Sequence, residues 1–490
     1  MKKVSILFPK KIGTIAPEIY GHFSEHIGGV FYDGLWVGRD SAVPNINGFR
    51  KDLIEKLRAI HPPVLRWPGG CFAETYRWRD GIGKKRPVRR SWWTKYDGRY
   101  ENNEVGTHEF VELCELIGAK PYFAVNVTSC TPQDALEWMD YCLSPRGTTT
   151  LALERETNGH PEPFDIPFWG IGNENWGGGG NMTPEYYALK YRQYATAMKN
   201  TGFPVKFFAG GPNSGDYNWS HKLSASLGEH PPIVDGMSMH YYTINNQKGN
   251  TADEVTNCTR DGWYAVLEKA ALIEERITRH YAVTQSYKME EKLKLVIDEW
   301  GCWHPEGSGP SKGYNLFEQQ STMRDAMVAA TTLNIFNKHC DKIIMANLAQ
   351  LCNNLHCLIL AGGEHCIVTP TYHVFDMYQE HQGATLVDTV VDSNEIFEEK
   401  LSVSASVKDG QLLITLANLS CEQDCEVSLD FLGGDVLNKA TVRTLAEDSI
   451  NAHNTFEDPC AVMPRDSEID PHKTVTVPRA GIVALRVALA

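Results

Sequence analysis

Two stretches decide the fold: Gly170-Ile171-Gly172-Asn173-Glu174-Asn175-Trp176 and Leu295-Val296-Ile297-Asp298-Glu299-Trp300. Each is a short apolar run that ends abruptly in a carboxylate. A strand buried on both faces of a parallel sheet is a near-continuous hydrophobic run, and α/β barrels place their reacting groups at the carboxyl ends of such strands. The two stretches therefore predict two buried strands of one barrel, each ending in a glutamate.

The surrounding sequence supports a barrel because short apolar runs alternate with amphipathic helical stretches. Helices are expected over residues 47–60, 107–117 and 183–200, the last one starting with Thr183 as N-cap and Pro184 at the first helical position. Eight candidate strands lie at residues 19–23, 64–67, 121–127, 167–172, 205–209, 236–240, 294–298 and 343–348. The predicted fold class is an α/β protein with a (β/α)8 TIM barrel over residues 15–383.

The pattern changes at about residue 384. Residues 412–419 and 482–487 alternate between apolar and polar side chains, and few helical stretches accompany them. We therefore expect residues 384–490 to form a C-terminal antiparallel β-sandwich. The first strand, residues 3–8, alternates in the same way, so residues 1–14 are expected to pair with this sandwich.

Composition limits the possible partners and the compartment. The 490 residues carry a net charge of −14, and the basic clusters are confined to residues 84–86 and 89–90, which argues against nucleic acid and membrane surfaces as partners. The 13 cysteines are odd in number and form no CxxC pair, which favours reduced thiols. The N-terminal apolar stretch is too short for a signal peptide, so we expect a cytoplasmic protein.

The two glutamates predict glycoside hydrolysis. Glu174 ends the fourth predicted strand and Glu299 the seventh, so they face each other across the barrel mouth. A retaining glycosidase needs two carboxyl groups about 5–5.5 Å apart, one to attack the anomeric carbon and one to protonate the leaving oxygen. Either acid taken alone would be read as a solvated loop residue. Asn173 is placed to bind a sugar hydroxyl, and Trp176 and Trp300 are expected to offer apolar faces to sugar rings.

Polar residues at other strand ends converge on the same rim. Glu25 could accept hydrogen bonds from a sugar diol, or form an ion pair with Arg66 or Arg79. Arg66 is expected to brace a catalytic carboxylate. Cys71 could line the site or be a core thiol, and Asn126 could serve the pocket or the structure. His240 is expected to support the site. Tyr242 could donate a hydrogen bond to the nucleophile, and Gln350 could hold a sugar hydroxyl.

Six motifs in this order resemble the α-L-arabinofuranosidases of glycoside hydrolase family 51. They lie at residues 19–26, 65–72, 172–175, 239–242, 297–300 and 346–350. The resemblance implies that Glu174 is the general acid/base and Glu299 the nucleophile of a retaining mechanism. It implies that terminal, non-reducing α-L-arabinofuranosyl groups are removed from arabino-oligosaccharides or arabinoxylan fragments, and that the protein forms hexamers. It also implies that the sugar is held by Glu25, Cys71, Asn173, Tyr242, Trp303 and Gln350.

Some alternatives stay open at this level. The same mechanism could serve a β-xylosidase, an endo-β-glucanase or a galactofuranosidase, and a non-catalytic carbohydrate-binding protein is the third hypothesis. The aromatic and basic stretch 89–100 could border the leaving-group side of the site or pack on a neighbouring subunit. His304 could line the pocket but is read as structural. No metal site or cofactor is implied, because HExxH, zinc-spaced cysteines and GxGxxG are absent from the sequence.

Overall fold

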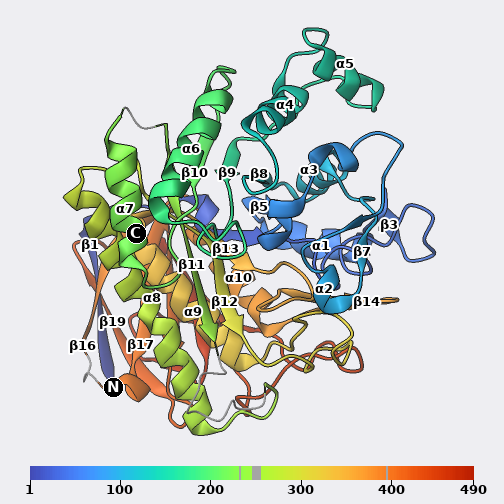
Figure 1. Cartoon of the computed structure of the whole chain (residues 1–490). Helices are drawn as coiled ribbons and strands as arrows, with labels where there is room; N and C mark the ends of the chain where they lie inside the picture. Colours follow the sequence, from blue (N-terminus) through green and yellow to red (C-terminus); the bar gives the residue numbers. More distant parts are fainter. Residues whose placement is uncertain (231–232, 245–254, 393–395) are drawn as a thin grey trace. The chain divides into compact units, whose positions relative to one another are not determined.

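The computed structural model describes residues 1–230, 233–244, 255–392 and 396–490 (Figure 1). Within these residues, eight parallel strands close into a barrel in which strands consecutive along the chain are neighbours, and the last strand adjoins the first. This confirms the predicted barrel. Its strands are β2 Gly21–Phe23, β5 Val64–Trp67, β8 Lys120–Val125, β9 Phe168–Ile171, β10 Lys206–Ala209, β11 Gly236–Ile244, β12 Leu295–Trp303 and β13 Ile343–Ala349.

Helices follow the strands as the alternating pattern predicts. Thr183 caps α6 through its side chain, which accepts the backbone N–H of Tyr186, and Pro184 is the first helical residue. The longer helices are α1 Lys51–Ile60, α3 Thr107–Ile117, α4 Pro132–Leu143, α6 Pro184–Lys199, α7 Tyr217–Gly228, α8 Arg260–Ser286, α9 Met323–Lys338 and α10 Pro370–Tyr378. Within the residues described, none of the helices has the length and hydrophobicity needed to span a bilayer.

One helix begins later than predicted. The expected start at residue 47 is wrong, because α1 begins at Lys51 and a small hairpin precedes it. That hairpin joins β3 Asn45–Ile46 to β4 Phe49–Arg50, and its turn residues Asn47 and Gly48 have φ angles of 54° and 102°. Asn-Gly is the preferred pair for such a left-handed two-residue turn, so the sequence did carry the signal.

The chain divides into two compact units. One unit holds residues 21–241 and 276–299, and the other holds residues 1–20, 242–275 and 300–490. The first contains most barrel strands together with α1 to α7. The second contains β13, α9, α10 and the C-terminal sheet.

The C-terminal sheet has nine strands in the described part of the chain, in the order β21-β20-β23-β18-β17-β16-β1-β19-β22. Strand β1 Lys2–Thr14 pairs with β16 in antiparallel and with β19 in parallel orientation, and the other pairings are antiparallel. Strands near both ends of the sheet contribute to one buried core, including Val442 of β20 and Val477 of β22. The sheet therefore folds over on itself as a sandwich does. The remaining strands are β16 Thr385–Asp392, β17 Leu401–Lys408, β18 Gln411–Asn418, β19 Cys425–Leu432, β20 Val436–Leu445, β21 Arg465–Ile469, β22 Val475–Val477 and β23 Ile482–Leu489. The domain limits at residues 14–15 and 383–384 stay a prediction.

Candidate active site

Glu174 and Glu299 come together in the unit that holds residues 21–241 and 276–299. Glu174 lies just beyond β9, with a φ of 44°, in the left-handed region that a residue with a side chain rarely occupies. Glu299 lies inside β12 rather than at its end, because this strand continues to Trp303. One oxygen of each carboxylate and one ring nitrogen of His240 all lie within 4.8 Å of one another. The two acids are thus close enough to act on one bond.

His240 of β11 links three carboxylates. Its Nδ1 is 2.9 Å from Glu174 Oε1 and 3.4 Å from Glu299 Oε2, and its Nε2 is 3.1 Å from Asp298 Oδ1. Carboxylate oxygens accept hydrogen bonds, so both ring nitrogens must donate and the ring is an imidazolium. Burial alone would lower the pKa of His240, but the carboxylates, Glu299 foremost, raise it from 6.5 to about 10.

Arg66 of β5 braces the nucleophile candidate from one side. Its Nη1 donates to Glu299 Oε1 at 2.8 Å, and its Nη2 donates to Asn173 Oδ1 at 2.5 Å. The guanidinium is buried, and its Nε lies 3.5 Å from Asp298 Oδ2. One planar cation therefore fixes both the carboxylate of Glu299 and the amide of Asn173.

Asp298 contacts both cations, Arg66 and His240. It accepts hydrogen bonds from Ser238 Oγ at 2.6 Å and from the Tyr122 hydroxyl at 2.9 Å. Burial would raise the pKa of Asp298, but Arg66 and His240 lower it to about 2. Burial raises the pKa of Glu299, and the same two cations oppose this rise.

Glu25, just beyond β2, faces the same site. Its Oε1 accepts the backbone N–H of Phe72 at 2.8 Å and the indole N–H of Trp93 at 2.9 Å. The alternative of an ion pair with Arg66 or Arg79 is not observed among the contacts described, because both arginines pair with other carboxylates. Burial and the charge on Glu299 raise the pKa of Glu25 to about 7.

Gly70 and Cys71 close the space between these acids. A Cβ on Gly70 would lie 2.8 Å from Glu299 Oε1 and 3.4 Å from Glu25 Oε2, so a larger residue there would displace the Glu299 carboxylate. Cys71 Sγ is 3.9 Å from Glu174 Oε2, and burial together with the charge on Glu174 raises the pKa of its thiol. The thiol is half-buried and faces the acids, which does not fit the alternative of a plain core cysteine.

Glu74 supports the site and was not predicted. It lies three residues beyond Cys71, is fully buried, and accepts the backbone N–H of Asn173 at 2.7 Å. Its other oxygen accepts the backbone N–H groups of Val127 and Thr128 at 3.0 and 2.9 Å. Burial raises the pKa of Glu74 to about 7. This carboxylate joins the loops after β8 and β9 and thereby positions Asn173.

Three predicted sugar-binding residues lie in the other unit. Tyr242 lies in β11, two residues beyond His240, and its ring packs edge-on against Trp303 with centroids 5.2 Å apart. Trp303 ends β12 and also packs against Phe317 at 5.0 Å. Gln350 is buried directly after β13, and its backbone N–H donates to the carbonyl of Asn354. All three thus lie at or near the carboxyl ends of barrel strands.

Other candidates are structural. Asn126 donates to the carbonyl of Tyr76 and to Ser129 Oγ, and its own oxygen accepts two backbone N–H groups, so it stabilises a turn. The predicted sugar-facing role of Trp300 is wrong, because the residue is 2% exposed and packs against Phe336 and Phe375. Trp176 is half-buried. His304 is buried and pairs with Asp325 at 2.7 Å, as the structural reading expects.

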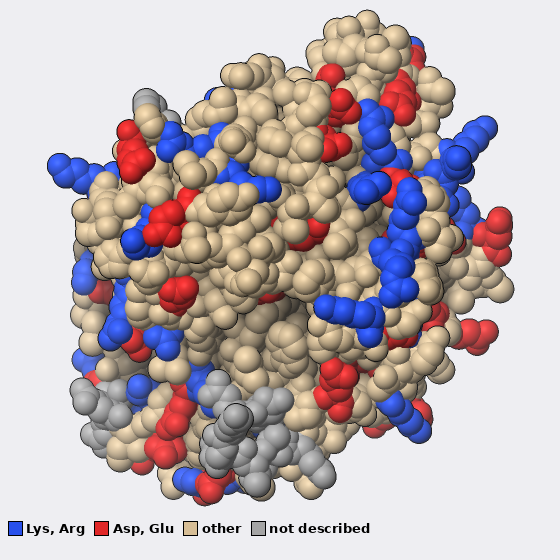
Figure 2. Space-filling model, viewed as in Figure 1, with Lys and Arg blue, Asp and Glu red and all other residues tan. Residues whose placement is uncertain are grey.

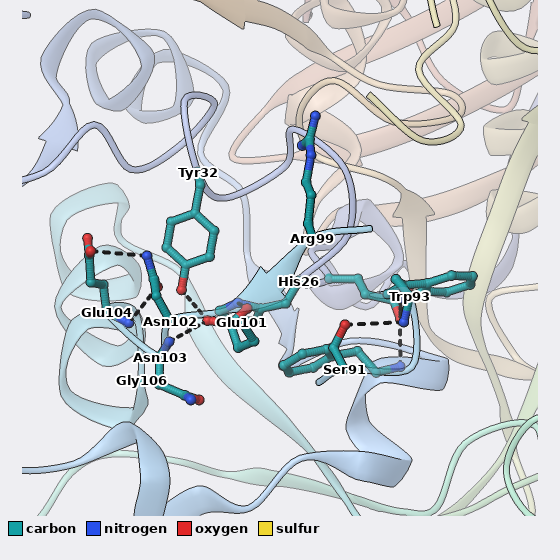
Figure 3. Close-up of polar contacts among 12 residues, drawn as sticks. His26, Tyr32, Ser91, Trp93, Arg99, Glu101, Asn102, Asn103, Glu104 and Gly106 are labelled. Carbon is teal, nitrogen blue, oxygen red and sulfur yellow. Dashed lines mark hydrogen bonds and ion pairs between the residues drawn. The ribbon is translucent and has the colours of Figure 1, made fainter. Parts of the chain in front are cut away.

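The stretch 89–100 forms a short hairpin that borders the site. Strands β6 Arg89–Arg90 and β7 Tyr100–Glu101 pair, and α2 Thr94–Asp97 lies between them. Glu101 anchors the hairpin, because it accepts hydrogen bonds from Tyr32 and from His26 Nδ1 (Figure 3). The indole of Trp67 donates to His26 Nε2 at 2.9 Å, so the other ring nitrogen, Nδ1, is the one that donates to Glu101. These contacts hold Trp93 where it can reach Glu25.

Among the described residues, two groups of side chains are close enough together to bind a metal ion. They are Glu174 with His240 and Glu299, and Cys302 with His304 and Asp325. In the first group both imidazole nitrogens already face carboxylates, and in the second the 2.7 Å contact of His304 with Asp325 has hydrogen-bond geometry. We therefore assign no metal to either group.

Comparison with known proteins gives a consistent result. Residues 56–260 match the family model for the alpha-L-arabinofuranosidase 1 domain, and residues 298–480 match that for the alpha-L-arabinofuranosidase C-terminal domain. The chain is 38% identical over 458 residues to an intracellular exo-alpha-L-arabinofuranosidase of Bacteroides ovatus, which covers 92% of this chain and 88% of that protein. It is 32% identical over 482 residues to a probable alpha-L-arabinofuranosidase C of Aspergillus fumigatus, covering 92% and 90%.

Solved structures agree with the sequence matches. The crystal structure of the GH51 arabinofuranosidase from Xanthomonas axonopodis pv. citri superposes with a TM-score of 0.92 at 35% identity, covering 99% of this chain and 100% of that one. The arabinose complex of the alpha-L-arabinofuranosidase from Thermotoga maritima superposes with a TM-score of 0.87 at 30% identity, covering 100% of both chains.

Proposed function

The chain belongs to the GH51 family of α-L-arabinofuranosidases and is a glycoside hydrolase, and on that premise we propose that Glu174 and Glu299 cleave the glycosidic bond by a retaining double displacement. The approach of the two carboxylates to within 4.8 Å carries this proposal. Retaining enzymes hold their carboxyl groups about 5–5.5 Å apart, whereas inverting enzymes need about 6.5–9.5 Å to admit a water molecule.

The two acids have different roles. Glu299 attacks the anomeric carbon while Glu174 gives its proton to the glycosidic oxygen, so that the leaving group departs and a glycosyl ester forms on Glu299. Glu174 then takes a proton from water, whose oxygen attacks the anomeric carbon and frees the Glu299 carboxylate. Two inversions give net retention. Arg66 and His240 stabilise the anionic form of Glu299, which supports its assignment as nucleophile.

The substrate is proposed from the resemblance and from the relatives. We infer that the enzyme removes terminal, non-reducing α-L-arabinofuranosyl groups from arabino-oligosaccharides or arabinoxylan fragments. A relative named as an exo-acting, intracellular enzyme supports the exo action and the cytoplasmic location. The sugar would be held by Glu25, Cys71, Asn173, Tyr242, Trp303 and Gln350. A homo-oligomer, specifically a hexamer, is inferred from the family resemblance and is tested by light scattering.

Single substitutions test the roles of the acids. Glu299→Ala and Glu174→Ala should each lower kcat on a nitrophenyl α-L-arabinofuranoside by orders of magnitude, whereas Glu229→Ala, on the surface, should leave it unchanged. Added azide should rescue Glu174→Ala and yield a glycosyl azide of retained configuration. An inverted azide would contradict the assignment of Glu299 as nucleophile.

A panel of nitrophenyl glycosides tests the sugar. We expect the arabinofuranoside to turn over faster than the xylopyranoside, glucopyranoside and galactofuranoside. Faster turnover of one of the others would instead indicate a β-xylosidase, an endo-β-glucanase or a galactofuranosidase. If both glutamate variants kept full activity, the measured activity would come from a contaminant, and the protein would be a non-catalytic carbohydrate-binding protein.

A further inference from the structure

The segment that contains the hairpin of residues 89–101 is positively charged, whereas the chain as a whole is negatively charged. Residues 77–99 contain nine Lys and Arg against two Asp, a balance of +7 in a chain whose total charge is −14. The proposed cleavage of a neutral furanoside does not require this charge. Concentrated charge on one face raises the local concentration of oppositely charged ligands and speeds their association.

This segment borders the proposed leaving-group side of the site. Trp93 donates to Glu25, and Trp92 lies against Gly178, where an added Cβ would be 3.2 Å from its ring and 2.7 Å from Cys71 Sγ. Cys71 in turn lies 3.9 Å from Glu174. The group that protonates the leaving oxygen sits at the boundary between the cleaved sugar and the leaving group. Trp92 and the residues beyond it are therefore placed beside the leaving group.

Some cations of the segment are already neutralised. Arg86 pairs with Glu109 at 3.0 Å and Arg89 pairs with Asp80 at 2.8 Å. Four further cations are exposed, and none of them has a carboxylate within 4.0 Å in the part of the chain that the structure describes: Lys84, Lys85, Arg90 and Lys95. Figure 2 shows basic side chains gathered over α2 and β7. These four charges remain available to a ligand.

The cations are combined with exposed aromatic rings. Lys95 Nζ lies 4.6 Å from the centroid of Trp92 and 4.8 Å from that of Tyr96, which is 57% exposed. Arg90 lies 5.7 Å from the ring of Tyr100, which is 56% exposed. An aromatic face beside a cation suits a sugar ring that carries a carboxylate, because the ring face packs on the aromatic and the anion pairs with the cation.

We propose that the hairpin of residues 89–101 binds a uronic acid residue on the leaving-group side, so that the preferred substrate is an arabinofuranosyl group on an anionic oligosaccharide. This inference rests on the proposed function. It names the chemistry of the leaving group, which the two glutamates do not determine.

A matched pair of substrates tests the inference. The first is a xylo-oligosaccharide that carries one arabinofuranosyl and one glucuronosyl group, and the second is the same compound after reduction of the uronate carboxyl to a primary alcohol. The two differ only in charge at one carbon. We expect kcat/KM to be about three- to tenfold higher for the anionic compound at low ionic strength, and the ratio to approach one in 0.5 M salt.

Variants locate the effect. Arg90→Gln combined with Lys95→Gln should lower the ratio of kcat/KM for the anionic over the neutral substrate by about threefold or more. Lys439→Gln combined with Lys473→Gln, on the C-terminal sheet, removes the same charge and should leave the ratio unchanged. Light scattering on all variants monitors assembly, because a surface used between copies of this chain would change the oligomer and not the ratio.

The failures are distinguishable. If the neutral substrate and a nitrophenyl arabinofuranoside are not cleaved, the proposed function is wrong. If they are cleaved but the ratio is near one at low salt, or if both double variants lower it equally, the inference is overturned and the proposed function stands.

Discussion

Replacing His240 by glutamine gives a sharp test of how the site controls Glu299. The substitution removes a cation whose Nδ1 lies 3.4 Å from Glu299 Oε2. At this distance two unit charges attract by about 5 kcal/mol with an effective dielectric constant of about 20, which is an upper bound. Arg66 remains at 2.8 Å and compensates in part. We therefore expect the pKa of Glu299 to rise by roughly 1–3 pH units, the range typical of losing an adjacent opposite charge.

The assay is the pH dependence of kcat/KM on a nitrophenyl α-L-arabinofuranoside. The acidic limb of this profile reports the ionisation of the nucleophile in the free enzyme. His240→Gln should move that limb upward by about 1–3 pH units, and at a pH below the limb of both proteins it should lower kcat/KM by about 10–10³-fold. Ser238→Ala is the matched control, because it removes a neutral donor to Asp298 and should shift the limb by less than about half a pH unit.

The result that refutes this reasoning is a uniform loss of activity without movement of the acidic limb. His240 would then only fill space and align groups, and its charge would not govern Glu299. A limb that moves to lower pH would mean that His240 raises the pKa of Glu299, the opposite of what is expected.

The same variant tests stability. The folded protein raises the pKa of His240 from 6.5 to about 10, so the native state binds this proton more tightly than the unfolded chain does. The stabilisation is fully present below about pH 6.5 and is lost as the pH rises through about 10. Urea unfolding at pH 6, 8 and 10 should show the difference between wild type and His240→Gln shrinking with increasing pH. A constant difference would mean that His240 is not an imidazolium in the folded site.

Three further substitutions test the parts around the acids. Gly70→Ala places a Cβ 2.8 Å from Glu299 Oε1, so kcat/KM should fall at least about hundredfold, and a crystal structure should show the carboxylate displaced. Trp93→Phe removes the 2.9 Å hydrogen bond to Glu25, and kcat/KM should fall about tenfold with the melting temperature nearly unchanged. Glu74→Gln turns an amide donor toward two backbone N–H groups, so urea unfolding should report a loss of about 2–6 kcal/mol, and full stability would show that its carboxylate is dispensable.

The sequence predicted the barrel because its buried parallel strands are almost purely apolar and therefore stand out. Seven of the eight predicted runs match the observed strands to within one residue at their starts, and the first strand begins two residues later because residues 17–20 form a short 3-10 helix. The end of β12 was misjudged, and this one error accounts for Trp300. Consecutive residues of a strand point to opposite sides, so Glu299 and Trp300 cannot both face the mouth of the barrel while the strand continues.

The supporting residues were harder to predict than the acids. A carboxylate after an apolar run is a local signal, but the contacts of His240 depend on how three strands are aligned. Glu74 lies only three residues from Cys71, yet its partners come from loops after β8 and β9. Trp93 reaches Glu25 only because Glu101 is anchored to His26 and Tyr32. None of these pairings leaves a pattern in a single sequence.

The charges of the site support the proposed division of labour. Two cations, Arg66 and His240, face three acids, Asp298, Glu174 and Glu299, at distances of 2.8 to 3.5 Å. Two ionised carboxylates neutralise the two cations, so the buried charges are paired. Asp298 holds the first negative charge, since its pKa is about 2. Arg66 contacts Glu299 directly and does not contact Glu174 in the described residues, so Glu299 takes the second charge. That charge suits the proposed role of Glu299, because the nucleophile of a retaining glycosidase must be ionised before the substrate binds.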